Sequence, residues 1–388
     1  MKTKVLAMAS AIALMAGATQ AADKIRIGMI TTLSGPGSGL GIDIRDGFAL
    51  GLEHVGGRLG GLETVVVEGD DQRKPDVAKQ LADRMVERDK VDVVTGIVWS
   101  NLALALMPGL SRSEVVFLSP NAGPSVLAGQ QCNPFFFNVA WQNDNNHEAM
   151  GKHVNDEGYR NVYILAPNYP AGRDALAGFK RYFNGAIAGE VYTELGQLDY
   201  AAELAQLRGA NPDAVFFFLP GGMGINFVKQ YDQAGLRGQI PLFGPAFSFS
   251  QDILGAVGDA ALGVMNTAQW SPDLDNPVNQ RFTAEFEAKY GRIPSLYASQ
   301  GYDAALLLDA AVGAVDGRIE DGEAFRAALL TADFDSVRGP FRFNRNHFPI
   351  QNFYLRQVTK DGQGRLTNRL VGTVFTDHGD AYAESCRM

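Results

Sequence analysis

Apolar and polar positions along this chain follow two alternating patterns. Short runs of β-branched and apolar residues, typical of buried parallel strands, are followed by segments with the period of amphipathic helices. In residues 91–127, an apolar run from Val91 turns at Gly96, a helical run follows, and a second apolar run starts at Val115. This alternation predicts an α/β fold with two doubly wound parallel-sheet lobes.

The same patterns predict elements along most of the chain. Besides those starting at Val91 and Val115, strands are expected at 24–32, 62–68, 135–141, 161–166, 190–194, 214–219, 240–243 and 263–269. Helices are expected at 42–54, 75–89, 102–107, 147–158, 169–183, 201–210, 225–234, 276–290, 297–315 and 323–330. Pro108 is expected to end the helix before it, because proline removes a helical hydrogen bond. Short strands at 341–343, 352–358 and 366–375 are expected to form hairpins that cover the second lobe.

The first 21 residues differ from the rest in composition. Lys2 and Lys4 precede an apolar segment that ends in small residues at the positions a signal peptidase recognises. We interpret residues 1–21 as a secretory signal peptide cleaved after Ala21, since the apolar part is too short to span a bilayer. A periplasmic protein is therefore expected.

Charge and cysteine content narrow the class of protein further. The formal net charge is −9, and removing a leader with two lysines and no acid leaves 32 basic and 43 acidic residues, a charge of −11. So acidic a chain argues against nucleic acid as a partner. An exported protein with two cysteines suggests one disulfide, Cys132–Cys386, which would tie the C-terminal tail to the loop before Phe135. Two unpaired thiols are the alternative.

Enzymatic and nucleotide-binding motifs are incomplete. The glycine-rich turn at 33–41 lacks the third glycine of a dinucleotide fingerprint, because position 42 is isoleucine, and Pro36 removes a donor N–H. The turn either lets a ligand approach the backbone or is a plain turn. Asp70 and Asp71 point to opposite faces of a strand end, so turn and capping roles fit better than paired catalysis. The five histidines show no metal spacing, and no Gly-x-Ser-x-Gly elbow occurs. We expect no enzyme activity, metal or cofactor.

Two consecutive strands end in loops rich in amides and hydroxyls, each next to a helix N-terminus. The loop residues are Ser100 and Asn101 after the first strand, and Asn121, Ala122 and Gly123 after the second. In an open α/β sheet, free backbone N–H groups and the helix dipole favour a small anion at such a place. Trp99 lies beside the capping residues, so a flat apolar surface is expected to adjoin the anion.

Several short segments, in their order along the chain, resemble the type I periplasmic solute-binding proteins, and more narrowly the leucine/isoleucine/valine-binding branch that serves ABC importers. The segments are 27–36 (IGMITTLSGP), 68–72 (EGDDQ), 96–101 (GIVWSN), 118–121 (LSPN), 166–172 (APNYPAG), 244–245 (GP) and 301–304 (GYDA). They are spread over nearly the whole mature chain. The resemblance implies two lobes joined by a three-crossing hinge, with the ligand bound in the cleft between them.

The resemblance also implies the domain boundaries and the partners. The N-terminal lobe would comprise residues 22–140 and 271–340, and the C-terminal lobe residues 141–270 and 341–388. Such a receptor closes on its ligand and docks on an ABC permease in the inner membrane, and we expect it to act as a monomer. A sensor that reports to a membrane receptor would bind ligand identically, so it is left as an alternative.

In that family the ligand carboxylate is held by the loops matching Ser100 and residues 121–123, and a tyrosine matching Tyr169 reaches in from the other lobe. Amino-acid binders of the branch place an acid after the glycine–proline pair, whereas here Pro245 is followed by alanine and phenylalanine. A buried ammonium without a carboxylate partner would be costly. Asp273 or Asp303 could substitute, although Asp303 fits better as a brace of its helix.

The remaining candidates for the cleft are mostly aromatic. They are Trp99, Phe247, Phe249, Trp270, Tyr297 and Tyr302, with Gly221 at the start of a predicted helix as a further contact. Ordinary core packing is the alternative for each aromatic side chain. An anion hole joined to aromatic walls predicts a small carboxylate ligand, preferably an aromatic acid of the benzoate or hydroxycinnamate type. A branched-chain or other apolar amino acid is the alternative.

Overall fold

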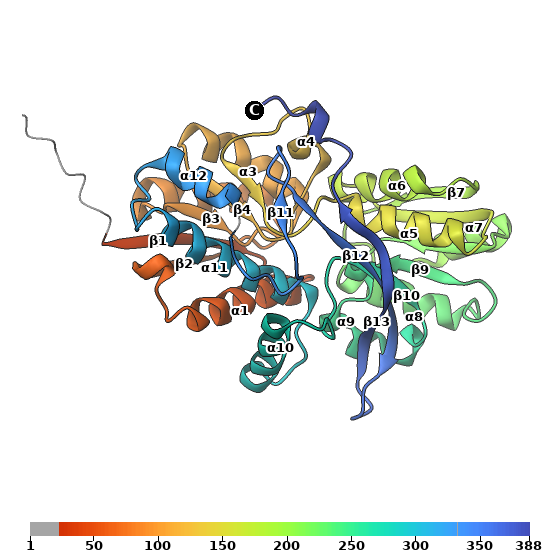
Figure 1. Cartoon of the computed structure of the whole chain (residues 1–388). Coiled ribbons are helices and arrows are strands. Elements are labelled where there is room, and N and C mark those ends of the chain that lie inside the picture. Colours follow the sequence, from red (N-terminus) through yellow and green to blue (C-terminus); the bar gives the residue numbers. More distant parts are fainter. Residues whose placement is uncertain (1–22, 332) are drawn as a thin grey trace, which may run out of the picture.

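The computed structural model describes residues 23–331 and 333–388, so the predicted signal peptide lies outside the described residues. Two sheets, each flanked by helices, form two lobes that lie side by side (Figure 1). Within the described residues, no helix is both long and apolar enough to cross a bilayer. The predicted α/β fold with two lobes is confirmed.

Lobe 1 is built on a five-stranded parallel sheet with the order β2-β1-β3-β4-β5. Its strands are β1 (Lys24–Thr31), β2 (Glu63–Asp70), β3 (Val93–Thr95), β4 (Val116–Ser119) and β5 (Phe136–Asn138). Its helices are α1 (Ser38–His54), α2 (Pro75–Arg84), α3 (Ser100–Arg112), α4 (Ser125–Ala128), α10 (Pro277–Tyr290), α11 (Leu296–Ala314) and α12 (Gly322–Thr331). Helices α1 and α11 pack so closely that a Cβ on Gly47 would lie 1.9 Å from the carbonyl oxygen of Ala298. Only glycine permits this approach.

Lobe 2 is built on a mixed sheet in which β7, β6, β8, β9 and β10 are parallel neighbours. These strands are β6 (Asn161–Pro167), β7 (Ala186–Thr193), β8 (Ala214–Phe217), β9 (Leu242–Pro245) and β10 (Met265–Ala268). The helices are α5 (Asn145–Asp156), α6 (Pro170–Tyr182), α7 (Ala201–Ala210), α8 (Gly222–Gln233) and α9 (Gln251–Val257).

The last strands extend this sheet instead of covering it. Strand β12 (Pro349–Lys360) pairs antiparallel with β10, and both β11 (Arg342–Phe343) and β13 (Leu366–His378) pair antiparallel with β12. The expectation of hairpins lying over the second lobe was therefore wrong in placement. The edge of β10 carries free backbone groups, and an antiparallel strand satisfies them.

The chain passes between the lobes after β5, after β10 and before β12, and the buried guanidinium of Arg338 links two of these crossings. It donates to the Ala140 carbonyl oxygen at 2.8 Å, to Gln351 Oε1 at 2.6 Å, and to Asp303 Oδ2 at 2.9 Å. Asp303 thus braces the hinge and lies outside the pocket. The residue boundaries predicted for the lobes stay a prediction.

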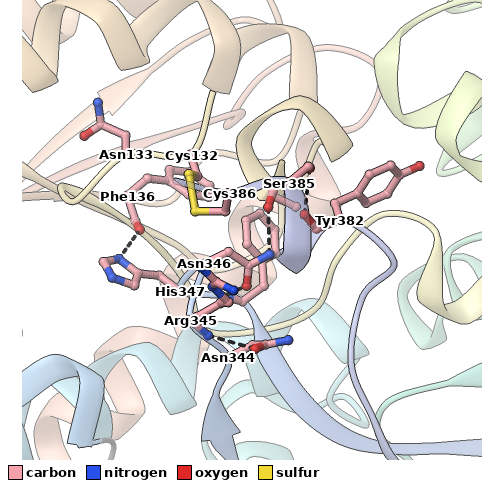
Figure 2. The surroundings of a disulfide bond; sticks show 12 residues. Cys132, Asn133, Phe136, Asn344, Arg345, Asn346, His347, Tyr382, Ser385 and Cys386 are labelled. Atoms are coloured by element: carbon pink, nitrogen blue, oxygen red, sulfur yellow. Dashed lines mark hydrogen bonds between the residues drawn. A yellow bond between two sulfur atoms is a disulfide. The ribbon is translucent and has the colours of Figure 1, made fainter. Parts of the chain in front are cut away.

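Cys132 and Cys386 form the predicted disulfide, across 254 residues of sequence and with 5.6 Å between their Cα atoms (Figure 2). The bond attaches the C-terminal tail to the loop between α4 and β5. Beside it, His347 Nδ1 lies 3.0 Å from the Phe136 carbonyl oxygen, and Asn346 donates to the Ala128 carbonyl oxygen at 2.7 Å. The tail of the chain is thereby held against lobe 1, close to the first hinge crossing.

Three helices differ most from the sequence-based expectation. Helix α3 continues through Pro108 to Arg112, because its buried apolar face continues through Met107 and Leu110 and outweighs the loss of one hydrogen bond. Helices α4 and α9 are not predicted from the sequence, since their four and seven residues are too few to show a period.

Candidate functional site

A narrow pocket lies where the two lobes meet, at the carboxyl ends of the central strands of both sheets. The cavity left between its walls is about 10 Å³, room for about one water molecule and far below the ~300–1,000 Å³ typical of small-molecule sites. The lining residues are Leu40, Val98, Trp99, Ser100, Asn121 and Tyr297 from lobe 1, Tyr169, Ala171, Phe218, Pro220 and Phe247 from lobe 2, and Trp141 and Asn143 from the first crossing. In this closed state the walls nearly meet, so a ligand of one ring fits only when the walls move apart.

The lobes are closed over this pocket. Ser125, at the start of α4 in lobe 1, donates its hydroxyl to Asp174 Oδ1 of α6 in lobe 2 at 2.6 Å and its backbone N–H to Oδ2 at 3.0 Å. The ring centroids of Trp99 and Tyr169, from opposite lobes, are 6.3 Å apart. A ligand therefore enters only when the lobes separate.

Aromatic rings form most of the wall. Phe247 follows β9 and packs on Trp141, with ring centroids 4.2 Å apart, and its centroid lies 6.0 Å from that of Phe218, which follows β8. On the lobe 1 side, the ring centroid of Tyr297 lies 6.0 Å from that of Phe247. Because these rings are almost fully buried, a flat ligand between them would be removed from water on both faces.

Amide groups of the first crossing organise the polar side of the pocket. Asn143 Nδ2 donates to Ser100 Oγ at 3.1 Å and to Asp174 Oδ2 at 2.8 Å, while its Oδ1 accepts the backbone N–H of Gly123 at 3.2 Å. Asn121 Nδ2 donates to the Val98 carbonyl oxygen at 2.7 Å. These bonds fix Ser100 and the loop after β4 relative to each other, and Asn143 connects both to Asp174 of lobe 2.

The first turn of α3 offers donors to the pocket. The backbone N–H groups of Ser100 and Asn101 precede the first intrahelical hydrogen bonds and meet no acceptor among the described residues. The helix dipole adds positive potential at the same place. One acceptor is also unused here, because Asn121 Oδ1 is buried without a partner in the described part of the chain. The turn can thus hold an anionic oxygen, and a neighbouring hydroxyl could donate to Asn121.

A carboxylate pair lies beside the pocket, between α1 and α9. Asp252 Oδ2 would lie 3.6 Å from a Cβ on Gly39, one helical turn before Asp43 on the same face of α1. Burial and the neighbouring Asp43 raise the pKa of Asp252 to about 7. Burial also raises the pKa of Asp43, against the effect of the Arg292 guanidinium, which donates to its Oδ1 at 2.7 Å. The second oxygen of Asp43 has no partner among the described residues.

The imidazole of His147, next to the pocket, carries no charge. His147 lies behind the aromatic wall, with its ring centroid 5.0 Å from that of Phe218, and its Nδ1 lies 2.7 Å from the Asn143 carbonyl oxygen. Complete burial lowers the pKa of His147 to about 3, so the imidazole is neutral. It supports the wall and carries no charge into the pocket.

The structure brings six of the predicted site residues together in the pocket lining: Trp99, Ser100, Asn121, Tyr169, Phe247 and Tyr297. Asn101, Ala122 and Gly221 lie next to lining residues in the chain and Gly123 lies two residues from one, but all four are outside the lining itself. Trp270 lies apart, where its Nε1 donates to Asn279 Oδ1 at 2.7 Å and its ring packs on Phe282. For Trp270 the geometry fits the alternative interpretation, core packing.

Sequence reasoning missed Trp141, Asn143 and Phe218. The hydrophobic pattern predicts only a loop at the first crossing, although residues 142–146, four amides and one aspartate, have an unusual composition and are all fully buried. Phe218 ends an apolar run and gave no signal of its own. Phe249 and Tyr302, also named as candidates, pack elsewhere, against Phe217 and Phe282 respectively.

A family model described as periplasmic binding protein matches residues 24–363. The chain is similar to an ABC transporter solute-binding protein of R. palustris, solved in complex with benzoate, at 32% identity and a TM-score of 0.89 over 94% of this chain and 100% of the other. A solute-binding protein of Rhodopseudomonas palustris BisB5, solved with 3,4-dihydroxybenzoic acid, is 30% identical with a TM-score of 0.85 over 93% and 99%. Leu/Ile/Val-binding protein homolog 6 of Brucella melitensis is 27% identical over 97% of this chain and 98% of its own.

Proposed function

The chain belongs to the periplasmic binding protein family, a family of ABC-type solute-binding proteins, and from that premise we propose that it is the periplasmic receptor of an importer for a small aromatic carboxylate. The ligand would be of the benzoate or hydroxycinnamate type. It would bind between the lobes and hold them closed for docking on a membrane permease. The chain would act as a monomeric binding protein without catalytic turnover.

The observation that carries the proposal is the composition of the pocket. One side presents unused backbone N–H groups at Ser100 and Asn101, and the rest is lined largely by aromatic rings. No carboxylate is among the described lining residues to receive the ammonium of an amino acid. The similar proteins with benzoate and 3,4-dihydroxybenzoate support the same ligand class.

The expected affinity follows from few interactions. Hydrogen bonds to a carboxylate contribute about 1.5–3 kcal/mol each, and stacking adds on the order of 1 kcal/mol per ring pair beyond the burial of area. Ordering the two lobes consumes part of this free energy. A net of roughly −8 to −10 kcal/mol, or micromolar to tens of nanomolar Kd, is expected.

A thermal-shift screen tests the proposal, because a ligand specific for the native state raises the melting temperature. Benzoate, 4-hydroxybenzoate, coumarate, leucine and isoleucine would be compared at equal concentration. We expect the aromatic acids to stabilise the protein and the amino acids to have little effect. Strong stabilisation by leucine alone would contradict the proposal, and conversion of a bound ligand into a product would contradict its non-enzymatic part.

A branched-chain amino acid is the second candidate, and the Asp43–Asp252 pair favours it. These carboxylates lie just outside the pocket, and each has a buried oxygen without a partner among the described residues. An ammonium group between them would offset one negative charge and donate to both unpartnered oxygens. The similarity to the Leu/Ile/Val-binding protein homologue is compatible with this alternative, and the screen separates the two classes.

A further inference from the structure

Arg73 lies at the mouth of the pocket and reaches from one lobe to the other. It belongs to the loop between β2 and α2 of lobe 1, and its guanidinium carbon lies 5.7 Å from the ring centroid of Trp99. A Cβ on Gly196, in the loop after β7 of lobe 2, would lie 2.9 Å from its Nη2. The side chain therefore bridges the closed lobes beside a wall of the pocket.

The charge of Arg73 is uncompensated. Its backbone N–H donates to Asp71 Oδ1 at 2.7 Å, but within the described residues its guanidinium forms no ion pair and donates no hydrogen bond. Arg292, which also bridges two elements, is by contrast paired with Asp43 and Asp46. A half-buried guanidinium has up to five N–H donors to offer, so an acceptor from outside the chain fits it.

Backbone geometry and a hydrogen-bond chain set the position of Arg73. Gln72 and Arg73 are consecutive non-glycine residues with φ of 52° and 59°, a left-handed conformation that the surroundings must enforce. The buried carboxylate of Asp71 does so, and its Oδ1 also accepts the hydroxyl of Thr32 at 2.6 Å. Trp99 Nε1 in turn donates to Thr32 Oγ1 at 2.9 Å. One network thus holds both the indole wall and the guanidinium.

Arg73 and the proposed carboxylate position meet different parts of Trp99. Ser100 follows the backbone of Trp99, whereas Thr32 accepts the indole N–H and the Arg73 guanidinium lies over the ring. The ring of Tyr169 is also close to the indole, with centroids 6.3 Å apart, and its hydroxyl has no hydrogen-bond partner in the described part of the chain. A ligand that lies along the indole with its carboxylate at Ser100 would direct the far end of its ring toward Arg73 and Tyr169.

We propose that Arg73 selects aromatic acids that carry an oxygen substituent at the ring end remote from the carboxylate. A hydroxyl or a second carboxylate there would accept hydrogen bonds from the guanidinium, with Tyr169 as a second partner. This inference rests on the proposed function and specifies the ligand further. It assigns the far end of the ligand to a residue outside the aromatic lining.

Isothermal titration of three probes tests the inference: benzoate, 4-hydroxybenzoate and terephthalate. The wild type is expected to bind the two substituted acids at least about tenfold more tightly than benzoate, as expected of a hydrogen bond to a charged donor. Arg73→Gln removes the charge and keeps most of the side-chain length, so it should abolish this preference and leave the affinity for benzoate within about twofold. Arg88→Gln, an exposed position on lobe 1 with the same charge change, should behave as wild type.

Two results would overturn the inference while leaving the proposed function intact. One is a wild type that binds benzoate as tightly as the substituted acids. The other is an Arg73→Gln variant that loses affinity equally for all three probes, which would make Arg73 a general closing contact. If the wild type binds leucine and none of the three acids, the proposed function fails, and this is evident before any variant is measured.

Discussion

The two lobes line one pocket with different chemistry. Lobe 1 supplies directional groups: the free N–H groups at the start of α3, the hydroxyl of Ser100, and an indole fixed by its bond to Thr32. Lobe 2 supplies mainly surface, since Phe218 and Phe247 have no polar atoms and Tyr169 has one. Under the proposed function, lobe 1 would orient the carboxylate first and lobe 2 would add apolar contact when the hinge closes.

The largest effect on ligand affinity is expected from the indole of Trp99 in lobe 1. Trp99→Ala removes the ring that faces Tyr169 and the anchor at Thr32, so Kd for benzoate should rise about 100-fold, in the range of hot-spot truncations of ~2–4 kcal/mol. Titration calorimetry would measure it. The matched control is Trp270→Ala, which should lower the melting temperature but change Kd less than threefold. Equal losses of affinity in the two variants would place the wall elsewhere.

The apolar wall of lobe 2 should contribute somewhat less to ligand affinity than Trp99 does. Phe247→Ala removes one ring that packs on Trp141, and a loss of about 2 kcal/mol, or roughly 30-fold in Kd, is expected. Because Phe247 contacts the ligand only after closure, the effect should lie mostly in the dissociation rate, which stopped-flow fluorescence can follow. Phe243→Ala on β9, which packs on His153 and Tyr159 instead, serves as the control. A purely association-rate effect would contradict the division of labour between the lobes.

A single hydroxyl of lobe 1 should matter less than either ring. Ser100→Ala leaves the backbone N–H groups in place, so Kd for benzoate should rise only about tenfold, equivalent to one hydrogen bond to a charged group. The neutral analogue benzamide should be less sensitive to the change. Ser113→Ala at the other end of α3 is the matched control. An unchanged Kd in Ser100→Ala would mean that the carboxylate lies elsewhere.

The smallest expected effect concerns pH and the Asp43–Asp252 contact between the lobes. In the open form Asp252 is expected to face water and ionise near pH 4, whereas in the closed form burial and Asp43 raise its pKa to about 7. The closed state therefore binds more protons, so its added stability is present at low pH and is lost as the pH rises through 7. The other charged or titratable groups nearby are Asp46, Arg292 and Tyr297.

Kd for benzoate, which stays ionised over this range, should therefore rise about threefold to tenfold from pH 5.5 to pH 8. The rise in Kd stays within this range because Asp252 is partly exposed to solvent. Asp252→Asn should flatten the profile, whereas Asp259→Asn, in the exposed turn that follows α9, should not. A flat wild-type profile would show that closure does not bring the two carboxylates together.

Strand–helix alternation and the ends of strands were enough to predict the fold and part of the pocket. Trp99, Ser100 and Asn121 follow buried strands directly, so the topology of a parallel sheet places them at one edge. Tyr169 and Phe247 were predicted by resemblance and by the missing acid after Pro245. The hydrophobic pattern could not decide whether a buried aromatic faces the pocket or the core, and so Trp270 was included.

The rest of the site depends on tertiary structure. Asn143 acts through partners from three segments, namely Ser100, Gly123 and Asp174, which no local pattern relates. The position of Arg73 depends on the left-handed backbone of Gln72 and Arg73, next to Asp71, whose carboxylate accepts the hydroxyl of the distant Thr32. Asp252 belongs to a helix too short to predict, and its contact with α1 exists only when the lobes are closed.

A crystal structure of the protein with 4-hydroxybenzoate tests the central claim most directly. The account predicts closed lobes, the carboxylate within hydrogen-bond distance of the backbone N–H and hydroxyl of Ser100, and the ring between Tyr169 and Phe247. Failure of 4-hydroxybenzoate to bind, together with a leucine complex in which the ammonium group is paired with Asp252 or Asp43, would contradict it.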